Sequence, residues 1–195
     1  MVEYNTVYEV AINDSNYQVS IKDYINGKRV EIWRCKFYQT WKGVIERCYS
    51  SKQYKRGPSY LGCKVCKEWL TFSNFKKWME QQDWEGKHLD KDLLGDGKLY
   101  SPDTCCFLPR NINMFIRDSR KKEARLPLGV TFNKRHKKYA AQGKSLDHKT
   151  VFLGYYSNPE AAHEAWKNFK FNLAQIYAEE LTDERSKAAL KDRYT

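Results

Sequence analysis

Short stretches of β-branched and aromatic residues alternate with polar residues over the first 34 positions of the chain. Two turn signals, Asn13–Asp14 and Asn26–Gly27, separate these stretches, and the second is a strong signal for a β-hairpin because both of its residues tolerate a positive φ. The pattern predicts a small β unit at residues 1–34. Two roles are open for this unit: a function of its own, or packing against the next part of the chain.

The pattern changes to helical spacing in the central part of the chain. Apolar residues recur at intervals of three and four over residues 36–50 and again over residues 71–82, so each stretch predicts a helix with one buried face. A loop is predicted between them, at residues 51–62, because glycine and proline interrupt the pattern. Residues 87–109 predict a strand, a glycine-rich turn and a second strand, and residues 109–118 begin another helix.

The last third of the chain predicts a small sheet followed by a helix. Three short strands fit residues 128–156, and Ser157 or Asn158 opens the helix with Pro159 in its first turn. Small alanines early in the helix allow it to lie close to the sheet. The apolar stripe of this helix is Ala162, Ala165, Trp166, Phe169, Leu173, Ile176 and Tyr177.

These elements predict an α+β protein built from five segments. The small β unit is followed by a central domain at residues 35–118 that contains a strand–turn–strand–helix (ββα) module with flanking helices. A basic linker at 119–127 then leads to a module at 128–180, made of a three-stranded sheet and a helix. Residues 181–195 are predicted to be a charged tail.

The composition is that of a folded protein. Apolar residues make up 41% of the chain and aromatic residues 15%, so a packed core is expected and disorder throughout is not. No apolar run approaches the roughly 20 residues that a membrane-spanning helix needs. The N-terminus has neither a basic region nor an apolar region of the signal-peptide type. We therefore expect a cytoplasmic protein without a membrane partner.

The formal net charge is +11, from 35 Lys and Arg against 24 Asp and Glu. Such an excess favours a polyanion as partner, because each cation placed at a phosphate releases condensed counterions. The alternative is a basic surface that serves only solubility.

A specific resemblance lies in the C-terminal module. It rests on Gly129-Val130-Thr131-Phe132, Tyr139-Ala140-Ala141-Gln142, Phe152-Leu153-Gly154-Tyr155-Tyr156 and Glu160-Ala161-Ala162. In order and spacing this series resembles the AP2 DNA-binding domain of plant transcription factors and of phage or mobile-element HNH proteins. The resemblance implies a three-stranded sheet that lies in the major groove of double-stranded DNA.

By this resemblance, residues on the sheet supply the DNA contacts. Arg135 is expected at guanine edges, Gln142 at adenine, and the lysines at phosphates. The alternative is a solvated basic face with Tyr139 in the core. The predicted DNA contacts are Lys134, Arg135, Lys137, Tyr139, Gln142, Lys144 and Lys149.

A second resemblance lies in the central domain. It rests on Trp41-Lys42-Gly43, Arg47-Cys48-Tyr49, Val65-Cys66-Lys67-Glu68-Trp69, Phe72, Phe75, Leu89-Asp90-Lys91-Asp92 and Tyr100-Ser101-Pro102-Asp103-Thr104-Cys105. These residues resemble phage proteins of the HNH type, which include homing endonucleases and often carry an AP2 module. The resemblance implies metal-dependent cleavage of DNA, with Mg²⁺ or Mn²⁺ as cofactor and a histidine as general base. Independently of the resemblance, basic residues cluster before the predicted hairpin, which gives the central domain a DNA-binding character: Lys42, Arg47, Lys52, Lys55 and Arg56.

The family's catalytic positions map onto this chain with two departures. Asp90 matches the metal-binding aspartate, but Lys91 occupies the position of the general base and Thr104 the position of the metal-binding asparagine. A lysine is normally protonated and cannot accept a proton. His88 is either a displaced base or a surface residue, and Asp92 is either a further metal ligand or a turn residue. A salt bridge from Lys91 to Asp90 or Asp92 would argue against catalysis.

The cysteines raise a separate possibility. Zinc is usually held by four tetrahedral ligands, and Cys63-x-x-Cys66 has the spacing of half such a site. A zinc site formed by Cys48, Cys63, Cys66 and Cys105 is one interpretation, and buried thiols in a small core are the other.

Three functions follow from the sequence. The first is an HNH-type homing endonuclease of a phage or mobile element that finds its site through the AP2-like module. The second is a DNA-binding regulator with the same architecture and an inactive catalytic centre. The third is a phage effector that binds a host protein in the host cytoplasm. The first two predict double-stranded DNA as partner.

Overall fold

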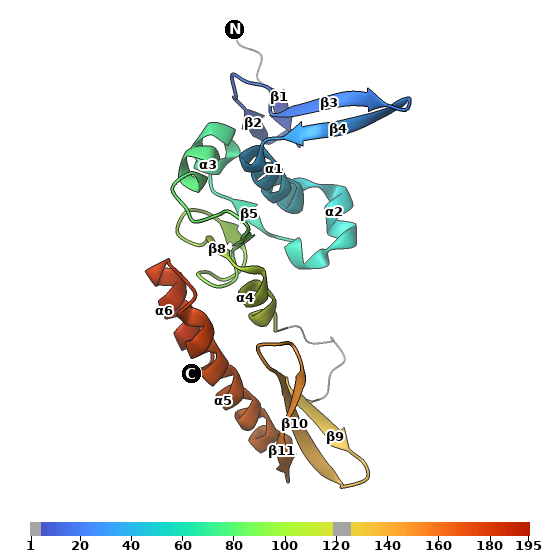
Figure 1. Ribbon diagram of the computed structural model, residues 1–195, viewed down its shortest axis with the longest axis vertical. Helices are drawn as coiled ribbons and strands as arrows, with labels where there is room; N and C mark the ends of the chain where they lie inside the picture. Colours follow the sequence, from blue (N-terminus) through green and yellow to red (C-terminus); the bar gives the residue numbers. More distant parts are fainter. Residues whose placement is uncertain (1–4, 119–125) are drawn as a thin grey trace. The chain divides into compact units, whose positions relative to one another are not determined.

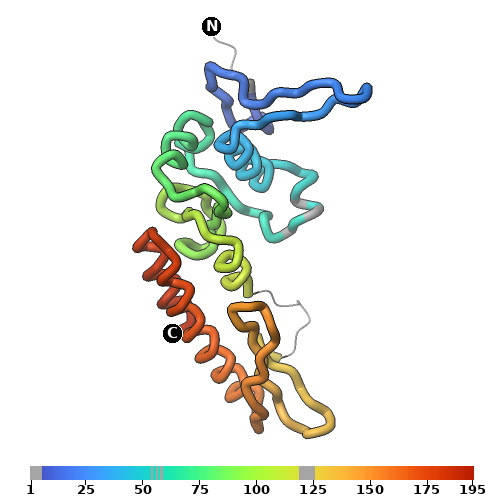
Figure 2. The backbone as a smooth tube through the Cα atoms, viewed as in Figure 1, coloured from blue at the N-terminus to red at the C-terminus, as the bar shows by residue number. Residues whose placement is uncertain are grey.

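The computed structural model describes residues 5–118 and 126–195, and these fall into two compact units that divide between Pro109 and Arg110 (Figures 1 and 2). Helices and several small sheets alternate along the chain, so the predicted α+β class is confirmed. Most of the predicted linker at 119–127 lies outside the described residues. In the described part of the chain, no helix is long and apolar enough to cross a membrane.

Two separate hairpins form the start of the first unit. Strands β1 (Asn5–Val7) and β2 (Ala11–Asn13) pair antiparallel, and Val7 and Ala11 are buried in the core of the unit. Strands β3 (Ser20–Ile25) and β4 (Lys28–Arg34) form the second hairpin, the β3–β4 ribbon. The predicted turn at Asn26–Gly27 is confirmed, with φ of +51° and +73°.

Helices α1 (Lys36–Tyr49) and α3 (Phe72–Met79) build the core of the first unit. The predicted apolar faces of both helices are buried, and the Trp41 ring donates its Nε1–H to the carbonyl of Trp69 at 2.7 Å. At the N-terminus of α3, the Ser73 backbone N–H and hydroxyl donate to Asp14, at 2.9 and 2.6 Å. Asp14 follows β2, so at least this part of the N-terminal β unit packs against the next part of the chain.

The predicted loop at residues 51–62 is only partly a loop. It contains helix α2 (Ser51–Arg56) and the short 3₁₀ helix η1 (Pro58–Tyr60). The Ser50 hydroxyl accepts a hydrogen bond from the Gln53 backbone N–H and so caps α2. Six residues are too few to show helical spacing, which is why the sequence pattern missed this helix.

Short strands complete the first unit. Strand β5 (Lys64–Val65), which precedes the 3₁₀ helix η2 (Glu68–Leu70), pairs in parallel with β7 (Leu99–Tyr100). Strands β6 (His88–Asp90) and β8 (Cys106–Leu108) pair antiparallel, with Asp90 opposite Cys106. The predicted strand–turn–strand at 87–109 is therefore present, with β7 as an additional strand.

The second unit holds a three-stranded antiparallel sheet in the order β11–β10–β9. Its strands are β9 (Val130–Asn133), β10 (Lys138–Lys144) and β11 (Thr150–Tyr156), as the sequence predicts. Helix α5 (Pro159–Ala178) follows, and the Asn158 side chain caps it by accepting from the Ala161 backbone N–H at 2.8 Å. One face of the sheet packs against α5 through a small core of Val130, Ala141 and Ala162.

Two further helices pack in the second unit. Helix α4 (Arg110–Phe115) lies within the predicted helix 109–118, and the Phe115 ring is 4.9 Å from that of Tyr177 on α5. Most of the predicted charged tail at 181–195 forms helix α6 (Glu184–Asp192) and packs on α5. Leu190 and Tyr194 are buried there, so this segment is part of the fold.

Candidate functional site

Asp90 at the end of β6 closes the turn that follows the strand. Its Oδ1 accepts the backbone N–H of Asp92 at 2.9 Å and that of Leu93 at 2.8 Å. The residue is 6% exposed. Burial raises the pKa of Asp90 above its ordinary value, although the two backbone hydrogen bonds act in the opposite direction. One carboxylate oxygen of the predicted metal ligand is therefore used to hold the turn.

Lys91, at the position of the expected general base, is buried and ion-paired. It is 7% exposed, and its Nζ donates to Oδ1 of Asp92 at 2.6 Å. Burial alone would lower the pKa of Lys91, but the hydrogen bond and the charge of Asp92 outweigh burial and raise this pKa. A lysine held protonated cannot take a proton from water. This ion pair is the salt bridge that argues against catalysis at this position.

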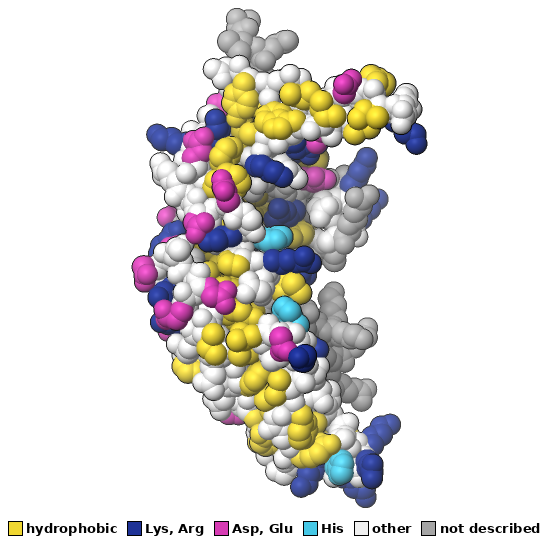
Figure 3. Space-filling view, viewed as in Figure 1, with side chains coloured by type: hydrophobic (Ala, Val, Ile, Leu, Met, Phe, Trp, Pro, Cys, Tyr) yellow, Lys and Arg dark blue, Asp and Glu magenta, His cyan; other side chains and the backbone are white. Residues whose placement is uncertain are grey.

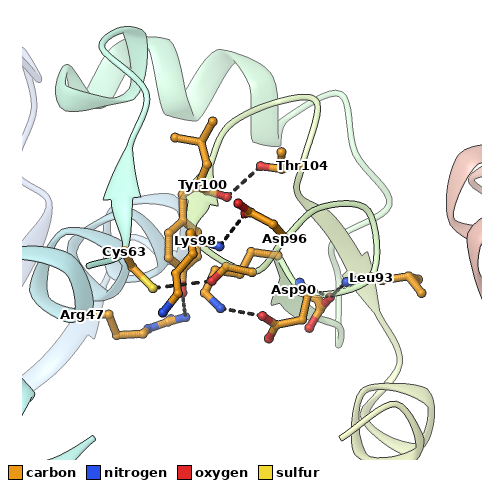
Figure 4. Close-up of polar contacts among 12 residues, drawn as sticks. Arg47, Cys63, Asp90, Leu93, Asp96, Lys98, Tyr100 and Thr104 are labelled. Carbon is orange, nitrogen blue, oxygen red and sulfur yellow. Dashed lines mark hydrogen bonds and ion pairs between the residues drawn. The ribbon is translucent and has the colours of Figure 1, made fainter. Parts of the chain in front are cut away.

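The rings of Tyr60 and Tyr100 lie near both Lys91 and Arg47. Figure 4 shows Arg47 beside Tyr100. The Lys91 Nζ lies 5.7 Å from the ring centres of Tyr60 and Tyr100, and the Arg47 guanidinium carbon lies 5.9 and 5.8 Å from the same rings. Arg47 also donates to the Tyr100 hydroxyl at 3.1 Å. These contacts hold Arg47 within the first unit, which leaves it poorly placed for the DNA contact predicted from the sequence. Lys42, five residues earlier on α1, is half-buried.

Thr104 and His88 complete the set of predicted catalytic residues. The Thr104 hydroxyl donates to the Leu99 carbonyl at 2.7 Å and accepts the Ser101 backbone N–H at 3.2 Å, so it stabilises the turn before β8. His88 lies on β6 opposite Leu108 and is exposed, whereas Asp90 on the same strand is buried. The side chains of His88 and Asp90 therefore lie in different environments.

The donor set around Asp90 does not fit the predicted metal. Asp92 is engaged by Lys91, and the Asp96 carboxylate accepts the Lys98 backbone N–H at 2.9 Å. Across residues 5–118 and 126–195, no three His, Cys, Asp or Glu side chains gather closely enough to hold a metal ion. A cation at the Lys91 position would also repel a divalent ion.

The cysteines predicted as zinc ligands also do not form such a group. Cys48, Cys63 and Cys105 are buried and Cys66 is half-buried. Burial raises the pKa of Cys48 and that of Cys105 to about 12, which keeps both as neutral thiols near neutral pH. The Cys63 thiol donates to the Gly97 carbonyl at 3.5 Å. The arrangement corresponds to the alternative interpretation, thiols in a small core.

The sheet of the second unit has one face that points away from α5 and carries exposed polar side chains. Successive residues of β10 point to opposite faces, and Tyr139, Ala141 and Gly143 lie on the face toward α5. A Cβ atom built on Gly143 would lie only 2.4 Å from the Phe169 ring of α5, which shows how closely the helix approaches. Lys138, Gln142 and Lys144 therefore lie on the opposite face, and all three are exposed.

The register of β11 adds aromatic side chains to that exposed face. Phe152 lies opposite Gln142 and Tyr155 lies opposite Ala140, and both rings are exposed. Their ring centres are 4.8 Å apart in an edge-to-face contact. The Tyr155 hydroxyl accepts from the Asn133 amide at 3.0 Å. We call the surface formed by Lys138, Gln142, Lys144, Phe152 and Tyr155 the outer face.

The predicted DNA contacts divide between this face, its ends and its opposite side. Gln142 and Lys144 lie on the outer face, and Lys134, Arg135 and Lys137 lie exposed in the turn between β9 and β10, where Figure 3 shows basic side chains gathered. Lys149 is exposed at the β10–β11 turn and pairs with Asp147 at 2.7 Å.

Tyr139 is the exception among the predicted contacts. It is half-buried on the face toward α5, and its ring lies 5.1 Å from that of Phe132. The alternative, in which Tyr139 belongs to the core, therefore agrees with its position. The sequence reasoning missed Lys138, Phe152 and Tyr155, although alternation from Gln142 could have identified Lys138.

No match to the chain was found among protein-family models, curated proteins or solved structures. The resemblances to the AP2 and HNH families remain predictions from the residues that carry them.

Proposed function

We propose that this chain binds double-stranded DNA through the outer face of the β9–β10–β11 sheet and the adjoining β9–β10 turn. The observation that supports this most is the composition of the outer face. It combines two lysines, an amide side chain and two exposed aromatic rings on the side of the sheet that α5 leaves open. A β element of this kind fits the major groove, which is about 12 Å wide.

The distribution of charge supports the same surface. Residues 110–195 contain 18 Lys and Arg and 10 Asp and Glu, a net charge of +8 out of the +11 of the whole chain. The long-range field of the second unit therefore favours a polyanion.

Roles on the outer face follow from the chemistry of each side chain. Gln142 presents a donor and an acceptor that match an adenine edge, and Arg135 presents a fork that matches guanine. Phe152 offers an apolar contact for a thymine methyl group. The lysines neutralise phosphates and set the register without reading sequence.

For the central domain we propose an inactive catalytic centre, so that the chain acts as a DNA-binding regulator derived from an HNH-type protein of a phage or mobile element. The ion pair between Lys91 and Asp92 supports this, because it replaces the base that the HNH reaction needs with a buried cation. The alternative remains an HNH-type endonuclease that uses Mg²⁺ or Mn²⁺. The third candidate, an effector that binds a host protein, is supported by no residue of the outer face or of the site around Asp90.

Fluorescence anisotropy with labelled duplex DNA tests the binding proposal. We expect the double variant Lys138→Ala/Lys144→Ala to bind at least about tenfold more weakly than the parent chain, because two phosphate contacts are lost. Lys167→Ala on α5 removes a lysine from another element and should leave affinity close to that of the parent. Equal affinity of all three proteins would exclude the outer face as the DNA interface.

Incubation of supercoiled plasmid with the protein and Mg²⁺ or Mn²⁺ tests the absence of cleavage. We expect the plasmid to stay supercoiled at protein concentrations that saturate binding. Nicking by the parent chain that disappears in Asp90→Ala would instead establish the endonuclease. Nicking that persists in Asp90→Ala would point to a contaminating nuclease and not to this centre.

A further inference from the structure

The β3–β4 ribbon presents an unusual surface for a two-stranded sheet. Every residue from Ile21 to Trp33 is exposed, and within the described residues these two strands pair only with each other. Figure 1 shows the ribbon extending away from α1. A two-stranded hairpin without a packed face is marginally stable in water. The exposure of this ribbon therefore suggests that another surface covers it.

The strand register divides the ribbon into two different faces. Residues directly opposite in an antiparallel pair point to the same side, and here Ile21 faces Trp33, Asp23 faces Val30 and Ile25 faces Lys28. The apolar face therefore contains Ile21, Asp23, Ile25, Lys28, Val30 and Trp33. Ile32 falls at the register shift between Ile21 and Lys22, so the pairing assigns it to neither face. The other face carries Ser20, Lys22, Tyr24, Arg29, Glu31 and Arg34 and is mostly charged.

This division is the pattern of an antiparallel sheet that packs one face on a core and leaves the other in water. Nothing in the described residues covers the apolar face of the ribbon. Ile21, Ile25, Val30 and Trp33 are 41%, 48%, 39% and 46% exposed. Figure 3 shows apolar side chains gathered along the ribbon. Contiguous exposed apolar side chains of this kind mark an interaction surface.

The two charges on the apolar face indicate what covers it. Asp23 lies on β3 and Lys28 on β4, and among the described residues neither forms an ion pair. The face is therefore neutral overall and carries one charge of each sign. A two-fold axis parallel to the strands would place β3 over β4 of a second copy. Asp23 of each copy would then lie within reach of Lys28 of the other, so the face is complementary to itself.

We propose that the apolar face of the β3–β4 ribbon binds the same face of a second copy of this chain. The two ribbons form a small two-layered β-sandwich whose interior is Ile21, Ile25, Val30 and Trp33 of both copies. This inference is independent of DNA binding, because it uses no residue of the second unit. Six side chains per copy are few compared with the 20–30 residues of a standard interface, so the dimer is expected to be weak and concentration-dependent.

Sedimentation equilibrium of the full chain over about a hundredfold range of protein concentration tests the proposal. The parent chain should shift from monomer to dimer across this range. Val30→Lys places a charge in the centre of the apolar face and should weaken the dimer at least about tenfold. Tyr24→Lys is the matched control, because Tyr24 is 72% exposed on the other face of the same ribbon. Circular dichroism of both variants confirms that they are folded.

A charge exchange tests the pairing itself. Asp23→Lys alone and Lys28→Asp alone should each weaken the dimer by bringing like charges together, and the double variant should restore it. A parent chain that stays monomeric at every concentration would overturn the proposal. So would a Tyr24→Lys variant that dissociates as much as Val30→Lys, or a double variant no stronger than the single ones.

Discussion

At the scale of single residues, Asp90 is best understood as the residue that holds the turn after β6. Asp90→Ala removes the acceptor of two backbone N–H groups in a buried place, so we expect unfolding free energy to fall by about 1 to 3 kcal/mol. Asp90→Asn keeps the Oδ1 acceptor and should lose less. Urea denaturation of the parent and both variants measures this difference. An equal loss in both variants would mean that the charge of Asp90, and not its hydrogen bonds, stabilises the turn.

Two features of Gly129 disfavour any other residue there: a positive φ and close packing against Trp166. Comparison with Gly62 separates their effects on stability. The φ of Gly129 is +74°, and a Cβ atom there would lie 2.1 Å from the Trp166 ring. Gly62 has a similar φ of +80° but nothing within 4 Å of such an atom. We expect Gly62→Ala to cost about 1 kcal/mol from backbone strain alone, and Gly129→Ala to cost about 1 to 3 kcal/mol more because Trp166 must move. Thermal denaturation of the two variants measures the gap, and equal losses would contradict the close packing of Trp166.

At the scale of elements, the helices and turns that depend on residues close together in the sequence were predicted. The helices at α1, α3 and α5 have apolar stripes long enough to recognise, and the Asn26–Gly27 hairpin needs only its own two residues. Helix α2 was not predicted because it is too short to show helical spacing. Helix α6 was not predicted because charged residues lie between its few buried positions. Short stripes carry little information about burial.

The candidate site was less predictable because it depends on register. Tyr139 and Gln142 were assigned to one surface, yet they lie on opposite faces of β10, as alternation requires. The face of the sheet on which Phe152 lies depends on a register shift between Ala141 and Gln142. The sequence contains no pattern from which this shift can be predicted. The ion pair of Lys91 is likewise a tertiary feature, and the sequence could only state what its presence would mean.

The contact between α5 and α6 should depend on pH in a defined direction. Hydrogen bonds from Lys187 and Lys191 of α6 lower the pKa of Glu179, at the end of α5, from 4.5 to about 2. An acid with a lowered pKa in the folded state stabilises the fold above pH 4.5 and loses this contribution as the pH falls toward about 2. The effect is expected to be small, because the pair is exposed.

Glu179→Gln isolates this contribution. We expect its melting temperature to lie below that of the parent at neutral pH, and the gap to close as the pH is lowered from 4.5 to about 2. Glu164→Gln, at an exposed position on the same helix, is the control and should show no such closing gap. A gap between parent and Glu179→Gln that stays constant over this range would contradict the ion pairs to α6.

At the scale of the whole molecule, the question is how a chain of net charge +11 distinguishes a DNA sequence from any other polyanion. Phosphate contacts give an affinity that falls steeply with salt, by about 0.9 in the slope of log K against log salt for each phosphate neutralised. Base contacts contribute affinity that salt changes little. Substituting a lysine and substituting Gln142 on the outer face should therefore change the salt dependence of DNA affinity in different ways.

Measuring duplex DNA affinity at several salt concentrations distinguishes the loss of a phosphate contact from the loss of a base contact. Lys144→Ala should reduce the slope by about 1 and weaken binding to all duplexes alike, because it removes a phosphate contact. Gln142→Ala should leave the slope unchanged and reduce the preference between duplexes that differ at one base pair, by about 1 to 3 kcal/mol. If both variants lower the slope and neither changes the preference, the outer face is a general polyanion surface and the sheet does not read sequence. If only Gln142→Ala changes the preference, then the small basic sheet acts as a reader, and its lysines act as the means of holding it in the groove.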